Sequence, residues 1–236
     1  MRKFWKRLPF GLRSSFHRRL HRFNSSPKLL RISAFRHYRT VSLIRASNIP
    51  VQLRIGESHS FPGWISTNFQ VITKNFLDAT KFYGRENCSA IFADNVIEHL
   101  DRSSGELLVN NAYEALVPGG ILRITTPDLH SIVMKYLDGS TEDVQQFALD
   151  LKGHGLDIKN PSDLLRVTFS AFGHHKGIIY DFNSLKVLLE SVGFSEISKF
   201  SPGVSSSASL SNLETRVGES DKWSQMAVEA TKPRSS

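Results

Sequence analysis

Short apolar runs alternate with segments of helical periodicity from about residue 51 to residue 230. Apolar runs bounded by glycine, proline and polar residues predict strands, whereas a spacing of three to four residues predicts amphipathic helices. The predicted strands are 51–55, 64–69, a run ending near Asp78, 89–94, 121–126, 195–200 and 223–230. Strands alternating with helices predict an α/β fold, with a mostly parallel sheet and helices on both faces.

Capping signals predict where the first helices of this region begin and end. Ser103 and Glu106 form an S-x-x-E capping box, which predicts a helix through residues 106–116. Pro118-Gly119-Gly120 is expected to end this helix and turn into the next strand. Pro127 is expected at the first position of the helix that follows that strand.

The C-terminal half carries a second set of signals. Asp181 or Asn183 is expected to cap a helix that stops at Gly193. Residues 138–177 are rich in glycine, lysine and aspartate. They predict either a lid over a binding site or a plain helical insertion, and the sequence leaves both open.

Charge is spread unevenly along the 236 residues. The formal net charge is +8, yet residues 1–56 hold fourteen Lys and Arg and no Asp or Glu. Residues 57–236 hold sixteen basic and twenty-two acidic residues. We therefore expect a cationic arm over residues 1–48, joined to a mildly acidic domain over residues 49–236.

The arm has the pattern of a basic amphipathic helix. Leu12, Phe16, Leu20 and Phe23 recur at helical spacing among arginines and histidines. Such a helix binds an anionic membrane surface, so we expect residues 1–23 to hold the protein at the membrane periphery. An organelle-targeting presequence, a packing arm and phosphate binding remain alternatives. Nucleic acid is the least favoured partner, because the aromatic residues do not interleave as in single-strand binders.

Composition excludes several classes of protein. No apolar run approaches the roughly 18–20 residues of a membrane span. The single cysteine, Cys88, excludes an internal disulfide and a cysteine-rich zinc site, and it suits a reducing, cytoplasmic location. A secreted disulfide-rich domain, a collagen-like fibre and an integral membrane protein are therefore not expected.

In parallel sheets, ligands bind beyond the carboxyl ends of the strands. The loops after residues 55, 69, 78, 94 and 127 should therefore surround one crevice. The segments that supply these five loops are VQLRIG, FPGWISTNF, FLDAT, IFADNVIEHL and LVPGGILRITTPDL. Two further segments follow in the C-terminal half, GHHKGIIYDFNSLKVLLESVGF and SNLETR.

The order of these segments, over about residues 50–232, resembles the class I S-adenosylmethionine-dependent methyltransferases. More narrowly, it is similar to a bacterial-type branch of predicted methyltransferases associated with surface-saccharide pathways. The resemblance implies a Rossmann-like sheet of seven strands, the last antiparallel, with S-adenosyl-L-methionine bound across strands one to four. It also implies methyl transfer to a small-molecule or saccharide acceptor by in-line displacement. No metal is expected, because the electrophile is already activated.

The resemblance also implies which residues contact the cofactor. Gly56 lies in the glycine-rich turn, Asn68 would face the ribose hydroxyls, and Asp78 would meet the adenine amino group with Ala79 beside it. The methionine end would be lined by Ala93, Asp94 and Asn95.

Two positions depart from the family pattern. Arg54 stands where relatives carry the first glycine of the turn, and Asn68 replaces an acidic residue. Forcing a non-glycine residue into a glycine conformation costs about 1–3 kcal/mol. The alternative function is therefore a catalytically degenerate methyltransferase fold that serves as a binding or membrane-associated module.

A hydroxyl or amine acceptor needs a group that removes its proton. The candidates for this catalytic role are His99, His174 and His175, and Asp128 could orient the acceptor. Glu98 is expected to face solvent or an arginine. No metal ligand spacing occurs around these histidines, so no metal site is expected.

Overall fold

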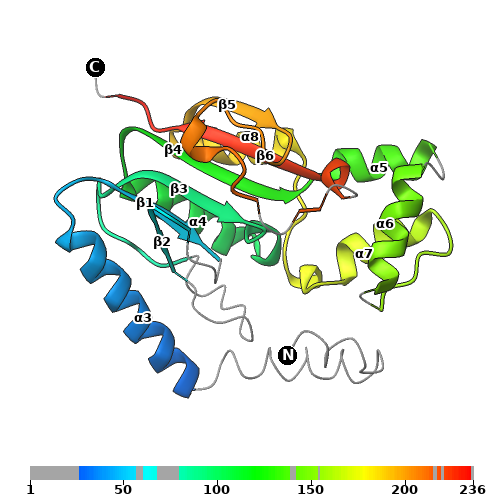
Figure 1. Cartoon of the computed structure of the whole chain (residues 1–236), viewed down its shortest axis with the longest axis horizontal. Helices are drawn as coiled ribbons and strands as arrows, with labels where there is room; N and C mark the ends of the chain where they lie inside the picture. Colours follow the sequence, from blue (N-terminus) through cyan, green and yellow to red (C-terminus); the bar gives the residue numbers. More distant parts are fainter. Residues whose placement is uncertain are drawn as a thin grey trace.

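The computed structural model describes residues 27–56, 61–67, 80–138, 142–153, 155–214, 217–218 and 221–234. Figure 1 shows a twisted sheet with helices packed beside it. The strands are β1 (Val51–Ile55), β2 (Trp64–Ser66), β3 (Cys88–Asp94), β4 (Leu116–Pro127), β5 (Ser195–Phe200) and β6 (Gln225–Thr231). The α-helices are α3 (Pro27–Ala46), α4 (Arg102–Ala115), α5 (Leu129–Asp138), α6 (Glu142–Gly153), α7 (Ser162–Ser170) and α8 (Phe182–Val192).

The sheet confirms the predicted α/β class and the direction of its last strand. Its order is β2-β1-β3-β4-β6-β5 among the described residues. Neighbouring strands from β2 to β4 are parallel, whereas β6 is antiparallel to both β4 and β5. Six strands are described, and the predicted strand that ends near Asp78 lies outside the described residues.

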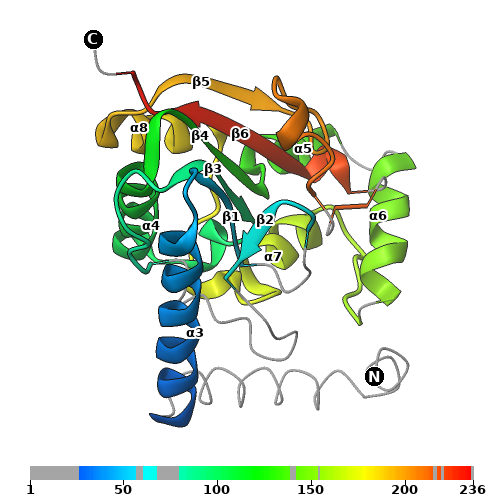
Figure 2. The same cartoon turned by 60° about the vertical axis from the view of Figure 1, so that its left-hand side comes forward.

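The two faces of the sheet are covered differently. One face packs on α3, α4 and α8 through apolar side chains such as Leu53, Ile91 and Leu122. Figure 2 shows α4 and α8 on the same side of the sheet. On the other face, Phe92 packs against Leu210 and Leu213, which lie in the mostly irregular segment 201–214. Within the described residues, the expectation of helices on both faces is therefore wrong.

Among the described residues no α-helix packs on this second face, and only residues 56–63 separate β1 from β2. A crossover of this length is shorter than the dozen or more residues of a usual helical connection. Residues 201–214, which include the short 3-10 helix η4 (Ala208–Leu210), cover the face instead. The core on this side therefore depends on a segment that follows β5, late in the chain.

The region between β4 and α8 is helical. Helices α5, α6 and α7 lie beyond the carboxyl end of β4, at the right of Figure 1. Residues 138–177 thus contain a helical insertion, one of the two alternatives that the sequence left open. Over the described part of the chain, no helix is long and apolar enough to cross a membrane.

Three local predictions for α4 and β4 are wrong. The N-cap of α4 is Asp101, whose side chain accepts from the Ser104 backbone N–H at 2.9 Å, so the capping box does not form. The run Pro118–Gly120 lies inside β4 and does not break it. There the register of β4 against β3 shifts, and Gly119 has a φ of +82°. Two steps along β3, from Cys88 to Ala90, match five along β4, from Leu116 to Ile121, so β4 carries extra residues where Gly119 tolerates the positive φ. Pro127 ends β4 and does not open α5.

The signals at α8 are confirmed. Asp181 accepts from the Ser184 backbone N–H at 2.7 Å, and both hydrogen bonds of a capping box are present. The helix ends at Gly193, whose φ of +110° is the left-handed conformation that favours glycine. These hydrogen bonds lower the pKa of the Asp181 carboxyl.

The described half of the arm packs on the domain. In α3, Thr40 and Ile44 are buried, and the ring of His37 lies 5.1 Å from that of Tyr83. Phe35 and Tyr38 are 68% and 72% exposed, so the helix also presents aromatic rings to solvent. The predicted amphipathic helix of residues 1–23 lies outside the described residues. The proposed boundary between residues 48 and 49 remains a prediction.

Candidate functional site

A buried ion pair lies at the carboxyl end of β1 and β3. The Arg54 Nη2 atom lies 3.3 Å from Asp94 Oδ2, and neither side chain is exposed to solvent. The same nitrogen donates to the Leu213 carbonyl at 2.8 Å. The Arg54 guanidinium also lies 5.1 Å from the ring centroid of Phe92 and 5.2 Å from that of Phe61. Arg54 thus fills the space that a glycine would leave open.

A second charged group anchors the covering segment. Arg123 of β4 contacts the Glu214 and Glu229 carboxylates at 2.5 Å each, and its guanidinium is buried. Because Arg54 and Arg123 both pair with Phe92 across the sheet, they point to the same face. Both arginines therefore bind residues 213–214 to the sheet.

The turn after β1 contains Gly56, which the resemblance places in the glycine-rich turn. Gly56 has a φ of +83°, and a Cβ added there would lie 2.2 Å from Val96 Cγ2. Only glycine fits this turn, because it must adopt a left-handed conformation against a buried side chain. The space beside Gly56 is therefore occupied by Val96. The Asp94 carboxylate is already paired with Arg54.

Of the remaining residues predicted to contact the cofactor, three lie within the described part of the chain and three lie outside it. Ala93 and Asp94 are buried at the end of β3. Asn95 follows them with a φ of +50°, and it donates to Glu98 Oε1 and to Gln225 Oε1 at 3.0 Å each. Asn68, Asp78 and Ala79, which would contact the adenosine, lie outside the described residues.

Two predicted catalytic histidines meet just beyond β3. Glu98 and His99 lie in the short 3-10 helix η2 (Ile97–His99), and His174 lies in η3 (His174–Lys176). The rings of His99 and His174 are 4.8 Å apart at their centroids. The His99 Nε2 atom lies 3.8 Å from Glu98 Oε1, with both side chains nearly buried. The structure therefore forms one cluster from residues far apart in sequence, which we call the Glu98–His99–His174 cluster.

Hydrogen bonds fix the orientation of this cluster. Thr126 at the end of β4 donates to Glu98 Oε2 at 3.2 Å, while Asn95 donates to Oε1. The His174 Nδ1 atom lies 2.7 Å from the Thr168 carbonyl oxygen. Since a carbonyl can only accept, this His174 nitrogen carries a proton, and in the neutral ring Nε2 is the nitrogen with the lone pair.

Close backbone packing holds η3 against η2. A Cβ added to Gly177 would lie 1.9 Å from the Glu98 carbonyl oxygen, so no side chain fits there. Gly173, just before η3, has a φ of +96°. His175, adjacent to His174, is exposed and does not share in this packing. Of the three predicted catalytic histidines, only His99 and His174 are therefore brought together.

The structure corrects the expectation for Glu98. It was expected to face solvent or an arginine, yet it is only 1% exposed and contacts Asn95, Thr126 and His99. Asn95 and His99 are close to Glu98 in sequence, whereas Thr126 lies in β4, so the burial of Glu98 depends on how β4 packs beside η2.

Asp128 has several protein partners. Its carboxylate lies 2.5 Å from Lys199 Nζ, and it accepts from the Ser131 hydroxyl at 2.7 Å. It also accepts from the His130 backbone N–H at 3.1 Å, at the start of α5. These contacts stabilise the first turn of a helix, where a carboxylate favours the helix dipole.

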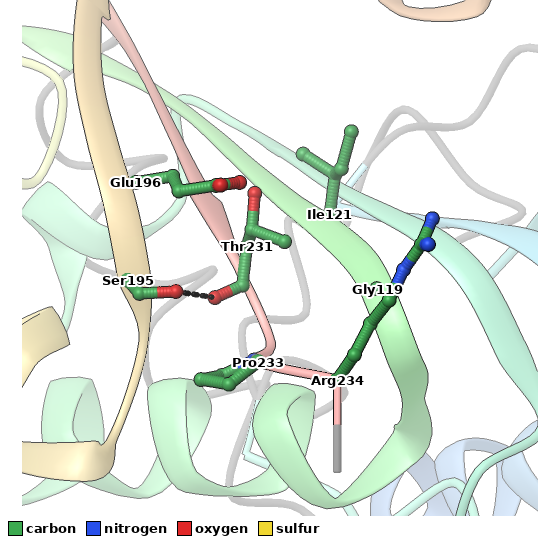
Figure 3. Close-up of a pocket in the computed structure, with 7 residues that line it drawn as sticks. All are labelled: Gly119, Ile121, Ser195, Glu196, Thr231, Pro233 and Arg234. Carbon is green, nitrogen blue, oxygen red and sulfur yellow. Dashed lines mark hydrogen bonds between the residues drawn. The ribbon is translucent and has the colours of Figure 1, made fainter. Parts of the chain in front are cut away.

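A separate hollow of about 540 Å³ lies at the far end of the sheet. Figure 3 shows Ser195 and Glu196 of β5, Thr231 of β6, and Arg234 around it. Gly119 and Ile121 near the start of β4 complete most of its wall. It shares no residue with the predicted site, and it lies away from the carboxyl ends where ligands of parallel sheets bind.

The arrangement at the carboxyl end can accept a proton. A carboxylate beside an imidazole stabilises the imidazolium that proton transfer creates. The Glu98–His99–His174 cluster supplies both groups next to the end of β3 and β4. It is the described group of residues with the composition of a catalytic site.

No family model matches the chain, and no curated protein does. Among solved structures, one similar chain is an S-adenosylmethionine-dependent methyltransferase from Thermotoga maritima, described as a possible histamine N-methyltransferase. The two are 12% identical, with 92% of this chain and 99% of that chain covered and a TM-score of 0.45.

An O-methyltransferase family protein from Burkholderia thailandensis is 13% identical, with 95% of this chain and 63% of that chain covered and a TM-score of 0.45. The phosphoethanolamine N-methyltransferase 2 of Haemonchus contortus, solved with phosphomonomethylethanolamine and S-adenosylhomocysteine, is 12% identical with a TM-score of 0.40. That match covers 84% of this chain and 52% of the methyltransferase chain. At such identities and TM-scores the function of this chain has to be argued from its own residues.

Proposed function

We propose that this protein transfers a methyl group from S-adenosyl-L-methionine to a hydroxyl of a small molecule or saccharide. The observation that carries the proposal is the buried Glu98–His99–His174 cluster at the carboxyl end of a parallel sheet. Crevices in this position bind ligands in open α/β sheets. Gly56, in a left-handed conformation at the end of β1, is the backbone position that would lie nearest the cofactor.

The residues of this chain would divide the work as follows. The backbone of Gly56, Ala93 and Asn95 would hold the methionine end of the cofactor. When bound, S-adenosyl-L-methionine supplies a methyl group on a positively charged sulfur, whose bond to carbon breaks as the acceptor oxygen attacks. His99 accepts the hydroxyl proton, and the Glu98 carboxylate stabilises the resulting imidazolium. His174 positions the His99 ring through the contact at 4.8 Å.

Calorimetric titration of the full chain with S-adenosylhomocysteine tests the first requirement. We expect saturable heat with one equivalent of ligand. The absence of heat at millimolar ligand would contradict the proposal. If binding is found, methylation of a panel of hydroxyl acceptors should fall by about 10²–10⁴-fold in His99→Ala, the range for loss of a general base. The neighbouring His175→Ala is the control and should keep its activity.

The Arg54–Asp94 ion pair favours a second candidate, a methyltransferase fold without catalysis that serves as a binding module. Both charges are buried, and Arg54 also binds Leu213, so this part of the crevice is filled by the protein itself. This candidate predicts that Arg54→Gly combined with Asn68→Asp raises cofactor affinity at least about tenfold, or about 1.4 kcal/mol. Unchanged affinity in a folded variant would count against it.

A further inference from the structure

We propose that Glu98, His99 and His174 form a binding site for one divalent transition metal ion of the zinc type. One ligand atom from each of the three side chains lies within 4.8 Å of the other two. Two ligands of a tetrahedral zinc ion are about 3.4 Å apart, given metal–ligand distances near 2.1 Å. The 3.8 Å between His99 Nε2 and Glu98 Oε1 is close to that spacing.

The ligand set indicates which metal suits the site. Two imidazoles and one carboxylate are the protein ligands of catalytic zinc sites that keep a fourth position open. Magnesium and calcium prefer oxygen ligands, so the two histidines disfavour them.

The hydrogen bonds around the cluster are those of an oriented metal site. Metal-bound histidines usually donate their other ring N–H to a carbonyl or carboxylate, which fixes the tautomer. His174 makes such a bond to the Thr168 carbonyl, and this leaves Nε2 as the ligand atom. Both Glu98 oxygens are likewise held, by Asn95 and Thr126, while a carboxylate retains further lone pairs for a metal.

Burial and packing support the same assignment. Glu98 and His174 are buried, so a carboxylate charge lies in a region of low dielectric. The hydrogen bonds from Asn95 and Thr126 hold this carboxylate in place, and a metal ion beside it would add a compensating positive charge. The contact of Gly177 with the Glu98 backbone fixes η3 against η2, which preorganises ligands from two separate loops.

The metal-site proposal does not depend on the proposed methyl transfer. The effect of a bound metal on the role of His99 does rest on that proposed function. A bound metal would use the imidazole lone pairs that otherwise accept a proton. The base role proposed for His99 in methyl transfer therefore applies to the metal-free protein.

The test uses the full chain without a polyhistidine tag, stripped of metal with a chelator. We expect it to bind one equivalent of Zn²⁺ in calorimetry, and Co²⁺ with a visible absorption band, but not Mg²⁺. Glu98→Gln and His174→Ala should weaken Zn²⁺ binding at least about 100-fold. Asn95→Ala, which removes the hydrogen bonds to Glu98 and Gln225 but no metal ligand, should weaken it about 10–100-fold.

His175→Ala is the matched control, because it removes an exposed histidine beside His174 and should bind as the wild type does. His17 and His21 of the arm are retained in every variant, so metal binding by the arm would appear equally in all of them. Far-ultraviolet circular dichroism of each metal-free variant checks that it is folded.

The proposal is overturned if the wild type binds no Zn²⁺, or if folded Glu98→Gln and Asn95→Ala bind it as tightly as the wild type. Equal loss of binding in His175→Ala would also overturn it. S-adenosylhomocysteine titrated into the same samples separates the two proposals. If the protein binds Zn²⁺ but not S-adenosylhomocysteine, the metal site stands and the proposed methyl transfer is refuted. If it binds S-adenosylhomocysteine but not Zn²⁺, only the metal site is refuted.

Discussion

Gly177 lies against the backbone of Glu98 so closely that no side chain can be added. A Cβ at Gly177 would be 1.9 Å from the Glu98 carbonyl oxygen and 2.6 Å from its carbonyl carbon. Because these are backbone atoms, neither can rotate away as a flexible side chain would. This contact couples η3 to η2 and places His174 beside His99.

We therefore expect Gly177→Ala to separate the two halves of the Glu98–His99–His174 cluster. The variant should lose about 1–3 kcal/mol of stability, the usual cost of overpacking. It should also lose Zn²⁺ affinity to a similar degree as His174→Ala. Chemical denaturation and calorimetry measure the two effects. Gly155→Ala, in a glycine turn away from the cluster, is the control for a general glycine effect. Unchanged metal affinity in Gly177→Ala would contradict the coupling.

A second prediction concerns the buried Arg54–Asp94 pair. Removing one partner of a buried ion pair typically costs about 3–5 kcal/mol, because the other charge stays buried alone. We expect Arg54→Met to lower the free energy of unfolding by this amount, and Arg54→Met with Asp94→Leu to recover most of it. Urea denaturation measures both.

The chain offers a matched control for that pair. Arg85 and Glu114 are also 3.3 Å apart, but their side chains are 78% and 44% exposed. Exposed pairs contribute about 0–1 kcal/mol, so Arg85→Met should change stability little. Equal losses in Arg54→Met and Arg85→Met would show that burial of the ion pair does not set its contribution.

A third prediction follows from the burial of Cys88, which raises its pKa from 9.0 to about 12. In the unfolded chain the thiol loses its proton at lower pH than in the folded protein. Above pH about 9 the unfolded state therefore binds fewer protons, and the free energy of unfolding falls as pH rises toward 12.

This contribution approaches about 1.4 kcal/mol per pH unit and is absent in Cys88→Ala. The stability difference between wild type and Cys88→Ala should therefore change by that slope once pH exceeds the unfolded thiol pKa. Denaturation curves at several alkaline pH values measure it. A difference that stays constant over this range would contradict the prediction.

The fourth prediction concerns the arm. Residues 1–23 contain eight Lys and Arg and no acidic residue. We expect the full chain to sediment with vesicles that contain phosphatidylserine, and much less with neutral vesicles or at high salt. Deletion of residues 1–23 should abolish most of this binding. A deletion variant that partitions as the full chain does would refute membrane binding by these residues.

Much of the fold could be predicted from the sequence because its signals are local. The apolar run 51–55 coincides with β1, and Asp181 and Gly193 bound α8 as predicted. Such signals act through hydrogen bonds and dihedral angles within a few residues. Where two local signals compete, prediction fails: Asp101 caps α4 in place of Ser103, and Pro118–Gly120 lies inside β4 in place of a turn.

The site was predicted only in part. The position of His99 beyond β3 followed from the strand pattern, and His174 was named as a candidate from its loop. Their contact, and the burial of Glu98 between Asn95 and Thr126, depend on which loops meet at the edge of the sheet. Sequence spacing carries no information about the contacts of Thr126 with Glu98 and of His174 with His99, because these partners come from different strands and loops.

The sequence by itself determined the alternation of strands and helices, the local caps and the segregation of charge into residues 1–56. Tertiary structure alone decided that Arg54 pairs with Asp94, that residues 201–214 cover the second face, and that Glu98, His99 and His174 meet. The physical reason is the separation in sequence over which each kind of interaction acts. Propensities and caps act between neighbours in the chain, whereas burial of charge and convergence of side chains depend on the packing of distant segments.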